Sequence, residues 1–218
     1  MSLWQHIESH LTDTLGESVS LNRPDSVAGG CINQAFRVQS GKQKFFVKVN
    51  DASGLDMFEA EAEGLNELGR AELLRIPKPI CCGTAEGHAY LVMDDLQLGG
   101  SGDQSVLGEG LAAMHRITAD QFGWHRDNTI GATPQINTQE SDWLSFWRDH
   151  RLGYQLQLAQ RKGAGSQVQK TGNELLDILP VLLNGHEPEA SLLHGDLWSG
   201  NYAFTKSGEP AIFDPAVY

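Results

Sequence analysis

The chain has 218 residues, of which 40% are hydrophobic and 20% are charged, so it can bury a core in one domain or in two small ones. This balance excludes a disordered, collagen-like or coiled-coil protein. A formal net charge of −12 disfavours nucleic acid and anionic membranes as partners and mildly favours amine-bearing ones.

The first 15 residues predict a helix instead of a targeting segment. Leu3, Ile7, Leu11 and Leu15 are spaced four apart, which indicates one apolar helix face. Acidic and histidine side chains stand where a signal peptide has a basic cap and an apolar stretch. The apolar runs elsewhere are far shorter than the about 18 residues needed to span a bilayer. The sequence therefore predicts a cytoplasmic protein with no membrane span, and three cysteines without metal or redox spacing argue against a disulfide scaffold.

The next part of the chain predicts a lobe built on an antiparallel meander. Short alternating runs are separated by a Gly-Gly pair and a Ser-Gly turn, which are signals for strands and tight turns. A helix is expected over residues 56–68. Strands are expected over residues 18–21 with 26–28, 35–39, 44–49, 80–82 and 88–93.

Residues 98–103, with the sequence LGGSGD, are typical of a flexible connection. We place the boundary between two lobes here, with a β-rich lobe over residues 1–97 and a mainly helical lobe over residues 98–218. The fold class is therefore α+β. Helices are expected over 106–118, 143–160 and 173–183, and strands over 192–194, 202–204 and 211–213.

The densest group of candidate catalytic residues lies in the stretch His194-Gly-Asp-Leu-Trp-Ser-Gly-Asn. Asp196 and Asn201 have the spacing D-x-x-x-x-N, which in kinases presents a carboxylate to the attacking hydroxyl and an amide oxygen to Mg²⁺. Asp214 ends an apolar strand and is suitably placed to bind the phosphate-bridging Mg²⁺. The alternative is an ordinary loop in which Asp196 caps a turn and Asp214 ends a strand.

Kinase chemistry also requires a strand lysine, a helix glutamate and a glycine-rich phosphate loop. The period of two in a strand turns Lys48 away from its apolar neighbours and toward a cleft, although a solvated lysine is the alternative. Glu61 lies on the apolar face of its helix, and a buried carboxylate needs a partner, for which Lys48 is the nearest candidate. Gly29 and Gly30 would expose backbone N–H groups to phosphate oxygens, although a plain hairpin turn is the alternative.

These residues resemble the fructosamine kinase (ketosamine-3-kinase) family, a branch of the aminoglycoside phosphotransferase-like group with a two-lobed protein-kinase-like fold. The resemblance runs nearly from end to end. It rests on residues 29–32, 46–50, 57–61, 91–93, 194–201 and 212–216, with Trp198 and the Phe-Asp-Pro-Ala stretch the most specific features.

The resemblance implies an activity and a set of roles. The activity is ATP-dependent phosphorylation of the 3-hydroxyl of fructosamine or ribulosamine adducts, either small or protein-bound, which is a step in glycation repair. Asp196 matches the catalytic base, and Asn201 and Asp214 match the Mg²⁺ ligands. Lys48 and Glu61 match the phosphate-positioning pair. The residues that match the adenine-binding hinge are Met93, Asp94, Asp95 and Leu96.

Family members continue with further C-terminal helices, so the resemblance implies that the large lobe is incomplete at Tyr218. Self-association through uncovered apolar surface is therefore expected. Two alternatives remain open: a kinase for another hydroxyl acceptor, such as an aminoglycoside or choline, and an inactive nucleotide-binding module. Cys31 would be either a redox-sensitive thiol at the nucleotide mouth or a spectator.

Overall fold

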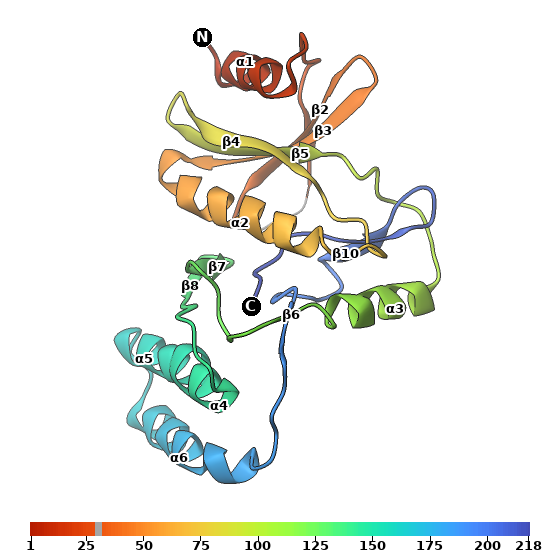
Figure 1. The fold of residues 1–218 in the computed structure, drawn as a ribbon. Helices are drawn as coiled ribbons and strands as arrows, with labels where there is room; N and C mark the ends of the chain where they lie inside the picture. The colour runs from red at the N-terminus through yellow and green to blue at the C-terminus, as the bar shows by residue number, and fades with distance from the viewer. Residues whose placement is uncertain (29–31) are drawn as a thin grey trace. The chain divides into compact units, whose positions relative to one another are not determined.

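The computed structural model describes residues 1–28 and 32–218. Gly29, Gly30 and Cys31, for which the sequence predicts a phosphate loop and a thiol at its mouth, lie outside the described residues. The chain divides into two compact units, Met1–Met114 with His194–Val217, and His115–Leu193 with Tyr218 (Figure 1). The lobe boundary at residues 97 and 98 stays a prediction. These units differ from it, because residues 98–114 and 194–217 belong to the same compact unit as the N-terminal sheet.

The first unit is built on a five-stranded antiparallel sheet with the strand order β1-β2-β3-β5-β4. Its strands are β1 (Asp25–Val27), β2 (Gln34–Ser40), β3 (Gln43–Asp51), β4 (Pro79–Ala85) and β5 (His88–Asp94). The other elements of this unit are α1 (Leu3–Leu15), α2 (Leu55–Leu68) with a short 3₁₀ turn before it (Ala52–Gly54), α3 (Gln104–Met114), and the hairpin of β10 (Tyr202–Phe204) and β11 (Pro210–Ile212).

The two faces of the sheet are covered by different helices, with α1 on one face and α2 on the other (Figure 1). On the α1 face, Phe45, Val47 and Val49 of β3 pack in one buried cluster with Ile7 and Leu11 of the helix. On the α2 face, a second buried cluster joins Phe58 and Leu65 of α2 to side chains of β5. The predicted alternation along β3 is confirmed, and Lys48 lies on the α2 face of the sheet because it stands between Val47 and Val49.

The strand expected over residues 18–21 is wrong, because these residues have no regular secondary structure. Their backbone N–H groups are bonded to side chains instead of to a neighbouring strand. Val19 donates to Thr12 Oγ1 (3.1 Å) and Leu21 donates to Glu8 Oε2 (2.8 Å). Polar side chains of α1 therefore hold this segment by local contacts that strand periodicity does not reveal.

The glycine-rich segment over residues 98–103 packs closely against the β10–β11 hairpin. The N–H groups of Gly99 and Gly100 both donate to the carbonyl oxygen of Phe204, at 3.1 Å. A Cβ on Gly100 would lie 1.9 Å from the carbonyl oxygen of Thr205, and a Cβ on Gly102 would lie 2.2 Å from the Phe204 ring. These glycines are therefore required for close approach of two backbones, and not for the flexible connection that the composition indicated.

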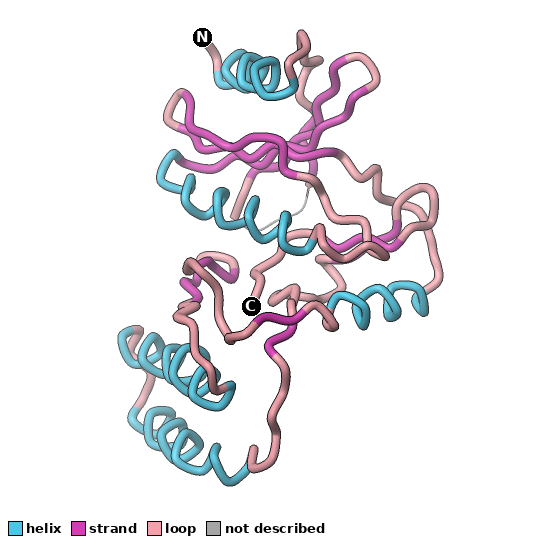
Figure 2. The backbone as a smooth tube through the Cα atoms, viewed as in Figure 1, coloured by secondary structure: helices cyan, strands magenta, loops and turns pink. Residues whose placement is uncertain are grey.

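The second unit is mainly helical. Its elements are β6 (Thr118–Ala119), β7 (Asn128–Ile130), β8 (Thr133–Gln135), α4 (Trp143–Phe146), a π-helical segment (Trp147–Gly153), α5 (Tyr154–Arg161), α6 (Ser166–Leu182) and β9 (Ala190–Ser191). The helix expected over 143–160 is thus helical throughout, with a π-helical middle part. Helices α5 and α6 lie side by side (Figure 2), and a Cβ on Gly172 of α6 would meet the Leu156 side chain of α5 at 2.3 Å.

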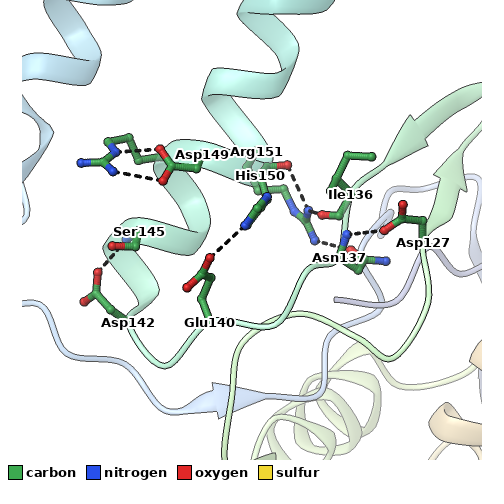
Figure 3. Close-up of polar contacts among 10 residues, drawn as sticks. Asp127, Ile136, Asn137, Glu140, Asp142, Ser145, Asp149, His150 and Arg151 are labelled. Carbon is green, nitrogen blue, oxygen red and sulfur yellow. Dashed lines mark hydrogen bonds and ion pairs between the residues drawn. The ribbon is translucent and has the colours of Figure 1, made fainter.

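Arg151, in the π-helical segment, joins several parts of the second unit (Figure 3). Its guanidinium donates to the carbonyl oxygen of Ile136 (2.5 Å), to Asn137 Oδ1 (2.8 Å) and to the carbonyl oxygen of Tyr218. Burial lowers the pKa of Arg151 to about 10, and the charge of Asp127 opposes this effect, so Arg151 stays charged and these acceptors satisfy its buried N–H groups. In the part of the chain that the structure describes, none of the helices is both long and apolar enough to cross a membrane.

Candidate active site

Lys48 and Glu61 form a buried ion pair within the first unit. Strand β3 presents Lys48 on the α2 face, and the apolar face of α2 carries Glu61. The Lys48 Nζ lies 2.5 Å from Glu61 Oε1, and the two side chains are 8% and 10% exposed. The pairing predicted from the single inward glutamate is confirmed. A charged pair at this depth is stable only because each partner neutralises the other.

Asp214 contacts the same lysine from a distant part of the chain. Its Oδ1 accepts a hydrogen bond from Lys48 Nζ at 2.6 Å. The backbone of Asp214 has φ of +57°, a left-handed conformation that is uncommon for residues other than glycine. The sequence did not predict this contact, because no local pattern relates two positions that are 166 residues apart.

The shared ammonium and the two carboxylates leave this cluster with one excess negative charge. Burial by itself lowers the pKa of Lys48, but the charges of Glu61 and Asp214 outweigh it and raise the pKa above its usual value. Burial raises the pKa of Glu61, and the neighbouring carboxylate of Asp214 adds to this, while Lys48 opposes it. Lys48 therefore stays charged, and the net charge of the cluster favours a further cation near Asp214.

His194 connects the segment that carries Asp196 to the segment that carries Asp214. It is 2% exposed. Its Nε2 bonds to the carbonyl oxygen of Phe213 at 3.0 Å, and its Nδ1 accepts from the Asp196 backbone N–H at 3.3 Å. A carbonyl oxygen only accepts and a backbone N–H only donates, so the proton of the neutral ring lies on Nε2. Burial lowers the pKa of His194, which favours this neutral form.

The same two segments also meet backbone to backbone. The Ala216 N–H donates to the carbonyl oxygen of His194 at 2.9 Å. A Cβ on Gly195 would lie 1.7 Å from the carbonyl oxygen of Ala216, and the φ of Gly195 is +79°. Only glycine fits this position, which explains the middle residue of the His-Gly-Asp motif.

Asn201 lies between Asp196 and Asp214. Its Nδ2 donates to the backbone oxygen of Asp196 (2.8 Å), to Asp196 Oδ2 (3.3 Å) and to the backbone oxygen of Asp214 (3.4 Å). The structure therefore brings together the three residues that the sequence assigns to the base and the metal ligands. Because Nδ2 is used in this way, the side-chain oxygen of Asn201 remains as an acceptor, to which no residue of the described chain donates.

The donor set of this site fits Mg²⁺. An amide oxygen and a carboxylate are hard oxygen ligands, and Mg²⁺ in nucleotide sites takes one or two such ligands with phosphate oxygens and water. Residues 1–28 and 32–218 contain no group of three or more His, Cys, Asp and Glu side chains placed to hold a metal ion by themselves.

The residues matched to the adenine hinge are the last two residues of β5 and the two that follow it. Met93 is buried and opposite Phe46 in the sheet, so it lies on the face that carries Lys48. The carboxylate of Asp94 accepts from the Lys78 backbone N–H. Asp95 is bonded to Arg37 (3.4 Å) and, through Oδ1, to the Gln97 backbone N–H (3.0 Å). The side chains of the two aspartates thus hold the segment that follows β5 in place. Leu96 is half-buried. The hinge role of these residues stays a prediction.

Comparison with known proteins gives the same family as the motifs. The family model of fructosamine kinase matches residues 3–218. A probable ketoamine kinase of Synechocystis is 43% identical over 218 residues, which cover 99% of this chain and 73% of that protein. A chloroplastic protein-ribulosamine 3-kinase of Arabidopsis thaliana is 44% identical over 209 residues, which cover 94% of this chain and 64% of that protein. The chain thus spans between about two thirds and three quarters of the length of these relatives.

Solved structures show the same relationship at the level of the fold. A protein from Haemophilus somnus assigned as a fructosamine-3-kinase superposes with a TM-score of 0.85 at 28% identity, covering 98% of this chain and 72% of that one. An aminoglycoside phosphotransferase superposes with a TM-score of 0.60 at 16% identity, covering 98% of this chain and 71% of that one, which shows a shared fold. The expected α+β, kinase-like fold is confirmed, and the chain belongs to the fructosamine kinase family.

Proposed function

We propose that this protein transfers the γ-phosphoryl group of ATP, with Mg²⁺, to the 3-hydroxyl of a ketoamine adduct. The observation that carries the proposal is the constellation around Lys48: a buried lysine between Glu61 and Asp214, beside a loop in which Asn201 links the carboxylate of Asp196 to the Asp214 backbone. The names of the relatives support ketoamines, and ribulosamines among them, as the acceptor class.

Each side chain of this constellation suits one part of the transfer. Asp196 accepts the proton of the acceptor hydroxyl as its oxygen attacks the γ-phosphorus, and ADP leaves. Lys48 keeps a positive charge for the phosphate oxygens because two carboxylates hold its pKa high. The side-chain oxygen of Asn201 and the carboxylate of Asp214 are the ligands for Mg²⁺, which neutralises charge on the phosphates when it is bound.

The acceptor class is tested by offering several acceptors with Mg²⁺ and ATP. Fructosyl-lysine, ribulosyl-lysine, an aminoglycoside and choline are each incubated with the chain and with a version extended to the length of its relatives, and ADP release is measured. The Asp196→Asn variant of each length is the control for release without catalysis. We expect ADP release with the ketoamines alone.

The second candidate acceptor is an aminoglycoside or another small hydroxyl compound. One observation favours it, the fold that this chain shares with an aminoglycoside phosphotransferase. ADP release with only the aminoglycoside or choline would contradict the ketoamine proposal and support this second class. Nucleotide binding without ADP release for any acceptor, at both lengths, would instead identify a nucleotide-binding module without kinase activity.

A further inference from the structure

Two asparagines form a side-chain pair at the end of the sheet where β2 begins. Asn50 lies near the end of β3, and Asn33 comes directly before β2. The Asn50 Nδ2 donates to the Asn33 Oδ1 at 2.7 Å. The pair has no part in the functions assigned above, although Asn33 follows closely on the glycines for which the sequence predicts phosphate binding.

A second contact determines which way both amides point. The backbone N–H of Asp51 donates to Asn50 Oδ1 at 2.7 Å. A backbone N–H is only a donor, so the side chain of Asn50 must present its oxygen to Asp51 and its NH₂ group to Asn33. Asn33 must in turn present its oxygen to Asn50. The group left over is the NH₂ of Asn33, which donates to no residue of the described chain.

The pair shares a face of the sheet with Lys48. The register places Ala35 of β2 opposite Lys48 of β3, and residues directly opposite in an antiparallel pair project to the same face. A side chain two positions along a strand keeps the same face, so Asn50 lies on the face of Lys48, and the hydrogen bond from Asn50 brings the Asn33 side chain to that face. The unused NH₂ group of Asn33 therefore belongs to a side chain bonded to Asn50, which is two positions along β3 from the lysine that is proposed to bind phosphate.

We infer that the side-chain NH₂ of Asn33 donates a hydrogen bond to a phosphate oxygen of the bound nucleotide, and that Asn50 is the positioning residue that orients it. The inference rests on the proposed function, because it requires a nucleotide with its phosphates at Lys48. A hydrogen bond to a charged acceptor is among the stronger ones, and an amide held by a fixed neighbour loses little freedom when it forms one.

Two nearly isosteric variants of the full chain test this inference. Asn33→Asp keeps an oxygen for Asn50 but replaces the NH₂ group by a second oxygen. Asn50→Asp presents an oxygen to Asn33, so the Asn33 amide turns over and its NH₂ group is consumed within the pair. The matched control is Asn22→Asp, which adds the same charge at the exposed edge of the same sheet and keeps the Oδ1 acceptor for the Gln39 N–H.

The measurement is the dissociation constant of each variant for Mg²⁺-ATP and for adenosine, together with its thermal unfolding midpoint. We expect both pair variants to bind ATP about tenfold or more weakly and to bind adenosine within about twofold of the unmodified chain, since adenosine has no phosphate. The Asn22→Asp control should bind both ligands as the unmodified chain does. Either pair variant suffices for the comparison if the other fails to fold.

Three results would overturn the inference. Unchanged ATP affinity in a folded pair variant would show that the Asn33 NH₂ does not contact phosphate. Equal losses for ATP and adenosine would show that the pair only maintains the structure, and an equal loss in the control would show a general effect of charge. Failure of the unmodified chain to bind ATP at all is a separate outcome that would contradict the proposed function itself, so the two failures are distinguishable.

Discussion

At the scale of single residues, several side chains of the candidate site each bond to two other groups. Lys48 holds two carboxylates, and Asn201 links Asp196 to Asp214. His194 bridges the same two segments with both ring nitrogens. Removing one side chain therefore disturbs more than one proposed role, so each test needs a variant that preserves the shape of the residue.

Asp196→Asn preserves shape and removes the proposed base. We expect ATP to bind with nearly unchanged affinity, because the carboxylate acts on the acceptor hydroxyl, while turnover falls about 10²-fold to 10⁴-fold. Nucleotide titration and single-turnover kinetics measure the two effects separately. A variant that keeps most of the turnover would exclude Asp196 as the base.

Asp214→Asn removes the charge that is proposed to bind the metal and leaves Glu61 as the remaining charged partner of Lys48. We expect Mg²⁺-dependent ATP binding to weaken along with the rate, because a neutral amide is a poorer ligand for a hard cation. Titrating ATP with and without Mg²⁺ isolates the metal contribution. ATP affinity that is independent of Mg²⁺ and unchanged in the variant would count against this role.

His194 predicts a pH dependence of stability. Its pKa is lowered in the folded state, so the unfolded chain binds more protons over the range between the two pKa values, and the free energy of unfolding rises with pH there. The stabilisation is present above the usual histidine pKa of 6.5 and is lost as the pH falls through the lower folded value. Urea unfolding of the unmodified chain and of His194→Gln, which retains a donor for the Phe213 carbonyl, should show a weaker pH dependence in the variant. Identical pH profiles would contradict this assignment.

At the scale of elements, the glycines before α3 allow the segment over 98–103 to pack on the β10–β11 hairpin. Through this contact, the segment that follows β5 and the proposed hinge is held against the β10–β11 hairpin, which precedes Asp214. It depends on the absence of side chains at Gly100 and Gly102. The packing of the site therefore extends beyond the residues with proposed chemistry.

Gly100→Ala tests this packing, and Gly108→Ala is its matched control. The first places a methyl group against the Thr205 backbone and should destabilise the fold by about 1–3 kcal/mol. The second lies in α3 with open space around the added Cβ, and should stabilise the fold by about 0.5–1 kcal/mol, since alanine is the better helix former. Denaturant unfolding of both variants provides the comparison, and equal effects of the two substitutions would show that the contact does not constrain residue 100.

At the scale of the whole molecule, apolar side chains remain exposed on α6 of the second unit. They are Val168, Leu175, Ile178, Val181 and Leu182, with exposed fractions between 37% and 78%. All of them except Val181 recur at spacings of seven, three and four residues along one side of α6. This spacing is typical of a helix face that packs against another helix. We therefore place the self-association expected from the sequence on this helix. Trp143 of α4 and Trp147 of the π-helical segment are less suitable, because they are half-buried and stacked on each other.

We expect the 218-residue chain to self-associate with rising concentration and Ile178→Glu to reduce this. Gln167→Glu is the control, because it adds the same charge to a position of α6 outside the apolar set. Sedimentation velocity over a range of concentrations measures the association. A chain that stays monomeric at high concentration would contradict the expectation.

Much of the local structure and of the candidate site could be predicted because the signals are local. The alternation of β3 and the apolar face of α2 determined that Lys48 and Glu61 face each other, and the spacing of Asp196 and Asn201 indicated one loop. The contact of Lys48 with Asp214 could not be predicted, since no periodicity connects strands so far apart in the chain. The glycines at 99, 100 and 102 predicted flexibility because composition does not distinguish a linker from a close contact.

The sequence by itself indicated the family through its resemblance to known motifs. It also indicated the α+β fold class and the inward-facing Lys48 and Glu61, because motif spacing and residue periodicity act over short distances along the chain. Only the tertiary structure decided which carboxylates share Lys48, which nitrogen of His194 carries the proton and which amide hydrogens of Asn33 remain unused. These depend on the direction of individual hydrogen bonds between distant segments. Such directions follow from which neighbours can only donate and which can only accept, and those neighbours are known only after the chain has folded.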